Sequence, residues 1–294
     1  MTLSEYLAQQ QSRVERTLDR WVPPESAAPE TIHRAMRYSL FAGGKRIRPV
    51  LCIASAEAVA GDAEGVENAA CTLELIHTYS LIHDDLPALD NDDLRRGRPT
   101  NHKVFGEAMA ILAGDSLLTF AFDVLANLPG ADAGKRIALV AELTRASGTI
   151  GGMIAGQVHD LEGEHQQPTA ELLDRIHRAK TGALLRAAVR MGAIYAGAPP
   201  DELQALSRYG EHIGLAFQIV DDLLDVEQSS AELGKTAGKD AAQHKITFPA
   251  VYGLERSHVM AQEQLAAAHQ ALEMFGARGD RLREIADLIV NRKA

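Results

Sequence analysis

The sequence predicts an all-α fold in which residues 1–294 form a single helical domain. Apolar residues recur at steps of three and four along most of the chain, as on one face of a helix. The chain has no convincing series of alternating apolar and polar stretches bounded by hairpin turns. Its glycine and proline breaks are short, so none is a linker between domains. With 294 residues, 46% of them hydrophobic, the chain can bury a sizeable core.

The helices can be placed from their start and stop signals. Thr2-x-x-Glu5 is a capping-box pattern that opens a first helix, which the prolines at 23–24 should end. A later helix shows its apolar face between Leu73 and Leu81 and should run on to Asp85. Pro87 should bend or stop it, because proline lacks an amide donor and crowds the preceding turn.

The second half continues the same pattern. Helical periodicity runs through the segment after Pro168, and one long helix is predicted from Asp201 to Val226. The polar stretch 228–240 contains two glycines and two lysines. It is either a surface connection or a mobile lid that carries cations.

Charge and cysteine content limit the function classes. The formal net charge of −10 argues against binding nucleic acid or a polyanionic membrane surface. Cys52 and Cys71 form no C-x-x-C pair, which excludes a disulfide scaffold and suits a reducing compartment. The N-terminus has no apolar targeting core, and no stretch approaches the ~18 uninterrupted apolar residues of a membrane span. We therefore expect a cytoplasmic protein with no membrane insertion.

Two clusters of aspartates, far apart in the sequence, each end an apolar helical segment. The first consists of Asp84, Asp85 and Asp90, and the second of Asp221, Asp222 and Asp225. Asp90 must fold back past Pro87 to share a metal ion with Asp84. Hard carboxylate oxygens without a nearby histidine or cysteine ligand pattern suit Mg²⁺. We interpret the clusters as a Mg²⁺ site that reverses the local charge and recruits an anion.

Cations are also grouped. Gly44 belongs to a glycine pair that precedes Lys45 and Arg48, and glycine lets a ligand approach the backbone closely. Arginine offers forked donors that match phosphate oxygens. His77 lies two turns before Asp84 on nearly the same helix face. The other candidate cations are Arg95, Arg96, Lys180, Lys235 and Lys245. A diphosphate substrate explains both the acidic and the basic sets.

These motifs together resemble the short-chain trans-prenyl diphosphate synthases, most closely the bacterial farnesyl diphosphate synthases. The resemblance runs from about Arg34 to the C-terminus. The matching motifs are GGKRIRP (43–49), LIHDDLPALDNDDLRRGRPTNH (81–102), GGMIAGQVHDL (151–161), KTGAL (180–184), FQIVDDLLD (217–225) and GKTAGKD (234–240). The resemblance implies the isoprenoid synthase fold, a helical bundle around a large central cavity, and a cytoplasmic homodimer.

It also implies a role for each candidate residue. The two aspartate motifs hold up to three Mg²⁺ ions with the allylic diphosphate, with Asp84, Asp90 and Asp221 as the favoured direct ligands. Arg95, Lys180 and Lys235 lie on the allylic diphosphate, and Thr181 and Gln218 face the developing allylic cation. Isopentenyl diphosphate is held by Lys45, Arg48, His77 and Arg96, and Gly44 is a further substrate-binding residue. Lys245 lies near the closing lid, and the tail residues Arg292 and Lys293 approach the site less surely.

Product length depends on the residues before the first aspartate. In the family a bulky residue five positions before Asp84, here Tyr79 with Ser80 beside it, closes the hydrocarbon pocket. An aromatic residue there and the inserted Pro87-Ala88 pair are typical of enzymes that stop at the C15 product. Helix geometry alone places Tyr79 about 140° from Asp84, so spacing does not prove that it faces the pocket.

Four alternatives remain open. A geranylgeranyl (C20) diphosphate synthase would use the same chemistry with a deeper pocket. A His-Asp metal phosphohydrolase would use His83 with Asp84, but it leaves the glycine–lysine motif and the second aspartate cluster unexplained. A terpene cyclase has no second diphosphate site to use Lys45, Arg48 and Arg96. A non-catalytic partner subunit is expected to have lost aspartates, and none is missing here.

Overall fold

The computed structural model describes the chain except residues 165, 228–244 and 293–294. Its first half contains the helices α1 (Leu3–Trp21), α2 (Glu30–Leu40), α3 (Ile47–Ala60), α4 (Val66–Asp84), α5 (Asn101–Phe105), α6 (Glu107–Ala126) and α7 (Ala133–Ser147). Its second half contains α8 (Met153–Gly163), α9 (Ala170–His177), the π-helix η1 (Arg178–Gly182), α10 (Ala183–Ala196), α11 (Pro200–Glu227), α14 (Phe248–Tyr252), α15 (Leu254–Ala271), the 3₁₀-helix η2 (Glu273–Gly279) and α16 (Asp280–Val290). The all-α prediction is confirmed.

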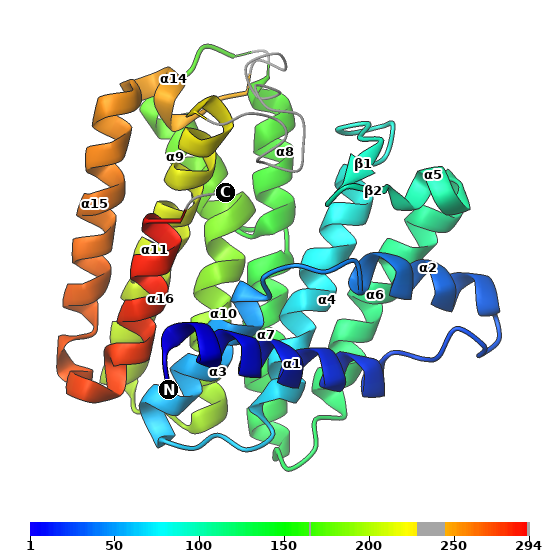
Figure 1. Ribbon diagram of the computed structural model, residues 1–294, viewed down its shortest axis with the longest axis horizontal. Coiled ribbons are helices and arrows are strands. Elements are labelled where there is room, and N and C mark those ends of the chain that lie inside the picture. Colours follow the sequence, from blue (N-terminus) through cyan, green and yellow to red (C-terminus); the bar gives the residue numbers. More distant parts are fainter. Residues whose placement is uncertain (165, 228–244, 293–294) are drawn as a thin grey trace.

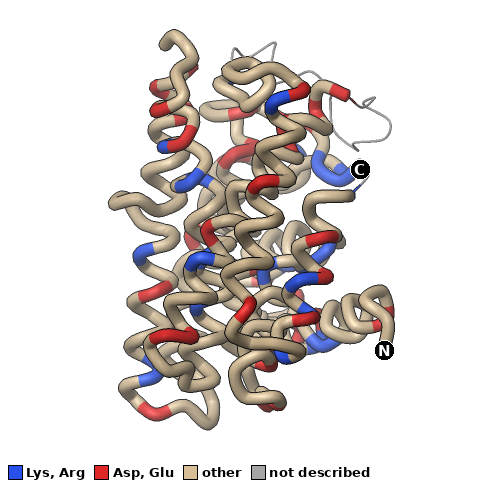
Figure 2. Tube along the Cα trace, turned by 90° about the vertical axis from the view of Figure 1, so that its left-hand side faces the viewer, with Lys and Arg blue, Asp and Glu red and all other residues tan. Residues whose placement is uncertain are grey.

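The long helices run alongside one another, and α1 crosses the bundle (Figure 1). The C-terminal ends of α4 and α11, which carry the two aspartate motifs, lie at the same end of the bundle. Acidic and basic residues are mixed along the helices rather than separated onto two faces (Figure 2). One apolar core joins α1–α4, α6, α7 and α10, and a second lies around α9, α11, α14 and α15.

Several element boundaries follow the sequence signals. Both hydrogen bonds of the Thr2–Glu5 capping box are present, and α1 ends at Trp21, just before the prolines. A cap of this kind stabilises a helix by about 1 kcal/mol. The long helix α11 extends over Pro200–Glu227, as expected. The predicted polar stretch 228–240, with Lys235, lies outside the described residues.

A two-residue hairpin after the first aspartate motif was not expected. Strand β1 (Leu94–Arg95) pairs antiparallel with β2 (Arg98–Pro99). Arg96 and Gly97 form the turn, with φ of 53° and 72°, the positive values that a tight hairpin turn requires. Such strands are too short to show an alternating pattern, so the sequence carried no strand signal. The hairpin places Arg95 on a strand and Arg96 in a turn.

The segment after Pro168 is helical but not one regular helix. A π-helical turn, η1, interrupts it at Arg178–Gly182 and contains Lys180 and Thr181. Glycines permit very close packing on both sides of this turn. A Cβ on Gly156 of α8 would lie 2.0 Å from the Lys180 amide nitrogen, and one on Gly214 of α11 would lie 2.8 Å from the Gly182 Cα. π-Helical turns occur frequently at functional sites.

Helix α6 is long and apolar enough to cross a membrane by length and composition, which was not expected from the sequence. The helix packs against α4, α2 and α7. Its Gly114 fits directly against the His83 imidazole of α4. A core helix passes the same length and composition test. We therefore interpret α6 as a helix of the bundle.

Candidate active site

The first aspartate motif folds back on itself as Pro87 predicted. Helix α4 ends at Asp84, and the Asp90 amide donates to the Asp84 carbonyl over 2.8 Å. Asp90 therefore returns to the end of the helix, where the Lys245 ammonium lies 3.6 Å from its carboxylate. Burial, opposed by the charge of Lys180 and reinforced by that of Asp90, raises the pKa of Asp84 to about 6. A cation bound here would favour the anionic form of Asp84.

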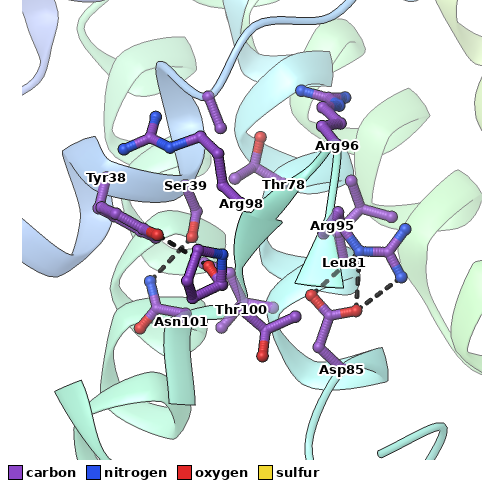
Figure 3. Close-up of a pocket in the computed structure, with 13 residues that line it drawn as sticks. Tyr38, Ser39, Thr78, Leu81, Asp85, Arg95, Arg96, Arg98, Thr100 and Asn101 are labelled. Atoms are coloured by element: carbon purple, nitrogen blue, oxygen red, sulfur yellow. Dashed lines mark hydrogen bonds and ion pairs between the residues drawn. The ribbon is translucent and has the colours of Figure 1, made fainter. Parts of the chain in front are cut away.

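Asp85 differs from its neighbours. It is buried, and the Nε of Arg95 donates to its two oxygens over 2.7 and 3.0 Å. Arg95 also lies 3.6 Å from Asp92. Figure 3 shows this pair in the wall of a small pocket that Arg96 and Arg98 also line. In this structure Asp85 orients Arg95.

The second aspartate motif contains two buried carboxylates and one partly open. The two oxygens of Asp222 accept hydrogen bonds from Gln218 Nε2 (2.7 Å) and the Phe248 amide (2.9 Å). Asp225 is also buried. Asp221 is 46% exposed, and Arg292 Nη2 donates to it over 3.1 Å. Arg292 thus reaches the site, whereas Lys293 lies outside the described residues.

Hydrogen bonds connect the π-helical turn to the second aspartate motif, and the charge of Lys180 connects it to the first. Thr181 donates to the Gln218 side chain over 2.8 Å, and Gln218 in turn donates to Asp222. The Lys180 ammonium lies 2.5 Å from Asp160, and the charges of Asp84 and Asp90 also raise its pKa despite burial. The structure therefore brings Lys180, Thr181 and Gln218 together between the aspartate motifs, as predicted.

The basic residues predicted to bind isopentenyl diphosphate lie around the turn that precedes α3. Arg96 Nη1 donates to the Gly43 carbonyl, and a Cβ on Gly44 would lie 2.8 Å from the Arg96 guanidinium. Burial and then the charges of Arg48 and Arg96 lower the pKa of His77 well below its ordinary value. The buried Nε of Arg48 has no hydrogen-bond partner among the described residues.

These basic residues are suited to an anion. His77, Arg48 and Arg96 can all donate to an anion, and the buried Arg48 Nε is a donor for which the described residues offer no acceptor. Lys45 lies beside them in the chain with an exposed side chain. The predicted isopentenyl diphosphate residues Arg48, His77 and Arg96 are therefore neighbours.

Tyr79 is a buried residue of α4, and Ser80 donates to the His77 carbonyl over 2.9 Å. Burial and the charge of Asp84 raise the pKa of Tyr79 to about 12. Its ring meets the His83 imidazole edge to face, at 5.8 Å between centroids. His83 itself contacts the Ile111 carbonyl of α6 through Nε2 at 3.1 Å. This contact does not support a His83–Asp84 metal pair of the phosphohydrolase type.

Two functional carboxylates, Asp160 and Glu74, were not predicted from the sequence. Asp160 belongs to the GQVHDL motif, but nothing in its spacing identified Lys180 as its partner. Burial alone would raise the pKa of Asp160, but the Lys180 ammonium lowers it below its ordinary value. Glu74 is a buried carboxylate one turn before His77, and its charge acts on Arg48 and Arg96.

The donor set fits Mg²⁺. Asp84, Asp90 and Asp221 offer hard oxygens, and cationic side chains already lie against Asp90 and Asp221. Within the described ranges no three histidine, cysteine or acidic side chains form a preassembled metal site. A metal ion held here would need further oxygen ligands, such as those of a diphosphate. The hydrogen bonds of Asp85 and Asp222 favour positioning roles for them over direct metal binding.

Comparisons with known proteins agree with this site. Residues 29–286 match the family model for polyprenyl synthetases. The chain is 49% identical over 275 residues to the chloroplastic geranylgeranyl pyrophosphate synthase of Capsicum annuum, covering 93% of this chain and 74% of the relative. It is 47% identical over 292 residues to a dimethylallyltranstransferase of Fischerella ambigua, covering 99% of this chain and 84% of the relative.

The fold agrees as well. The crystal structure of an FPP/GFPP synthase from Zymomonas mobilis superposes with a TM-score of 0.87 at 37% identity, covering 98% of each chain. Sequence, fold and the paired aspartate and basic clusters point to the same conclusion. The chain belongs to the polyprenyl synthetase family and is a short-chain trans-prenyltransferase.

Proposed function

We propose that the enzyme condenses isopentenyl diphosphate with dimethylallyl diphosphate and then with geranyl diphosphate, and releases (2E,6E)-farnesyl diphosphate. The observation that carries this proposal is the juxtaposition of two diphosphate-binding groups at one end of the bundle. One comprises the aspartates with Lys180 and Arg95, and the other comprises Arg48, His77 and Arg96. Two such groups match a reaction between two diphosphates.

The residues divide the chemistry between them. Bound Mg²⁺ would supply positive charge that stabilises the departing diphosphate. Lys180 and Arg95 would hold the allylic diphosphate, and the hydrogen-bonded pair Thr181 and Gln218 would face the allylic carbon that becomes cationic. Arg48, His77 and Arg96 orient isopentenyl diphosphate so that its alkene adds to that carbon. Loss of a proton to the released pyrophosphate completes the transfer without a nucleophilic side chain.

The proposed C15 product rests on the contact between the Tyr79 and His83 rings on α4. Tyr79 feels the charge of Asp84, which places the ring within electrostatic reach of the metal-binding end of α4. His83 closes the space between α4 and α6, because the imidazole fits against Gly114. Two aromatic rings here support a shallow hydrocarbon pocket and a C15 product.

Tyr79→Ala should lengthen the product. Removing the ring deepens the pocket, so C20 should become a main product at a turnover within about tenfold of wild type. Product chains from isopentenyl and dimethylallyl diphosphates are measured by mass spectrometry. Ser80→Ala is the matched control and should retain the wild-type products. An unchanged C15 product in Tyr79→Ala would show that Tyr79 does not close the pocket.

A geranylgeranyl diphosphate synthase is the second candidate. The Capsicum annuum relative, at 49% identity, carries that name, and the Zymomonas mobilis structure is named for C15 and longer products. Mainly C20 product from the wild-type enzyme would select this alternative over the C15 proposal.

We also propose that the enzyme is a cytoplasmic homodimer. Helix α6 and its neighbours expose Ile111, Leu112 and Ile137, and Ile150 is 93% exposed. Large apolar side chains exposed on neighbouring helices indicate a surface that a partner covers. A second copy is the occupant that the family resemblance implies. The free cysteines are buried, which suits a reducing compartment.

Leu112→Glu should therefore produce a monomer. Light scattering during gel filtration should give twice the 31.7 kDa chain mass for the wild type and a single chain mass for the variant. Val259→Glu, an equally exposed apolar position on α15, is the control and should remain dimeric. A monomeric wild type would refute the dimer.

A further inference from the structure

Arg46 is a fully buried arginine inside the GGKRIRP motif, between the two residues expected to bind isopentenyl diphosphate. Its guanidinium donates three hydrogen bonds. Nε donates to Glu15 (2.7 Å), Nη1 to Glu74 (2.6 Å) and Nη2 to the Leu40 carbonyl (2.6 Å). These acceptors belong to α1, α4 and the last residue of α2. One side chain thus ties three helices together behind the turn.

The backbone at Arg46 is strained. Its φ is 50°, in the left-handed region, and it directly precedes α3. Gly43 and Gly44 also have positive φ, but of these three residues only Arg46 carries a Cβ, which makes this conformation unfavourable. Such a conformation persists where the surroundings enforce it. The three hydrogen bonds of the Arg46 guanidinium provide that restraint.

Glu74 extends the arrangement to the diphosphate-binding side chains. This buried carboxylate pairs with Arg46, and its charge also favours the charged forms of Arg48 and Arg96. Burial disfavours the charged forms of Arg46, Arg48 and Arg96. Glu74 therefore stabilises the arginine cluster before any substrate diphosphate arrives. Arg96 contacts the same turn through the Gly43 carbonyl.

We propose that Arg46 is a positioning residue for isopentenyl diphosphate, acting with Glu74. By holding the left-handed turn, the Arg46 guanidinium fixes where Lys45 and Arg48 project, one residue before and two residues after it. It does not touch the substrate, because its side chain is enclosed. This inference rests on the proposed function. It assigns the positioning of the isopentenyl diphosphate residues to Arg46 and Glu74.

Arg46→Lys tests it. Lysine keeps the charge but cannot make three forked hydrogen bonds, so the turn should lose its fixed geometry while the local field is retained. The KM for isopentenyl diphosphate should rise about tenfold, because Lys45 and Arg48 would no longer be held in their binding positions. The KM for the allylic diphosphate should stay within about twofold, because Lys180 and Arg95 lie on other elements.

Arg13→Lys is the matched control. Arg13 pairs with Glu67 over 2.7 Å, so it joins the same helices α1 and α4 without contacting the turn. Its KM values for both substrates should be those of the wild type. An equal rise for isopentenyl diphosphate in this control would show that loosened helix packing causes the effect, and would overturn the inference.

Glu15→Gln provides a milder second variant if Arg46→Lys does not fold. Glu15 is 31% exposed, and its substitution weakens one of the three hydrogen bonds. The KM for isopentenyl diphosphate should rise about two- to threefold, with the allylic KM unchanged. Unchanged isopentenyl KM in the folded variants refutes the role of Arg46. A wild-type protein that elongates no chain refutes instead the proposed function.

Discussion

Asp84→Asn should lower kcat/KM by about a thousandfold or more, because one hard anionic ligand of the allylic-diphosphate site is lost. The same result is expected for Asp221→Asn, on the opposite motif. Folding should be retained, since burial already disfavours the charged form of Asp84 and raises its pKa to about 6. The measurement is steady-state chain elongation at saturating Mg²⁺, together with a melting curve.

Asp93→Asn is the control for this experiment. Asp93 belongs to the same acidic stretch, but it is exposed and pairs with Lys103 over 2.7 Å. Its activity should remain within about twofold of wild type, as for most changes to a surface ion pair. Wild-type rates in Asp84→Asn would contradict the assignment of the metal site. A thousandfold loss in Asp93→Asn would show that any charge in the stretch matters, whatever its position.

Gly156→Ala should lower kcat/KM by about a hundredfold, as a misplacement of about 1 Å in the reacting groups can do. The added Cβ would lie 2.0 Å from the Lys180 amide nitrogen and 2.4 Å from its Cα. Backbone atoms cannot rotate away, so α8 and η1 must separate. Lys180 would then move relative to Asp160, and Thr181 relative to Gln218.

Gly163→Ala on the same helix is the matched control. Its added Cβ would meet the flexible ends of two isoleucines, Ile246 and Ile176, at 3.3 and 3.4 Å. Activity should be within about threefold of wild type, because such contacts relax by small side-chain movements. Rates are compared below the melting temperature of each variant. Near-wild-type kcat/KM in Gly156→Ala would show that the glycine does not position η1.

Much of the candidate site was predictable because local rules decide it. The capping box fixed the start of α1, and Pro87 forced the turn that returns Asp90 to Asp84. The family motifs also identified the cluster of Arg48, His77 and Arg96 and the pair Thr181–Gln218. The local features were predictable from single residues, and the site residues were predictable from the combination of motifs.

Other features depend on contacts that single-residue patterns do not encode. The π-helical turn follows from close packing against Gly156 and Gly214, which lie on two other helices. The pairing of Lys180 with Asp160, and of Arg46 with Glu74, joins residues 20 and 28 positions apart. The two-residue hairpin depends on the positive φ of Arg96, a residue with no turn preference.

The most direct test of the central claim is to incubate the wild-type protein with dimethylallyl and isopentenyl diphosphates, with Mg²⁺ and after chelation. The claim is that two aspartate motifs and two basic groups act together on two diphosphates. It predicts pyrophosphate release with C15 prenyl diphosphate as the main product, and no detectable product after chelation. Release of phosphate without chain elongation, or an undiminished rate without Mg²⁺, would contradict it.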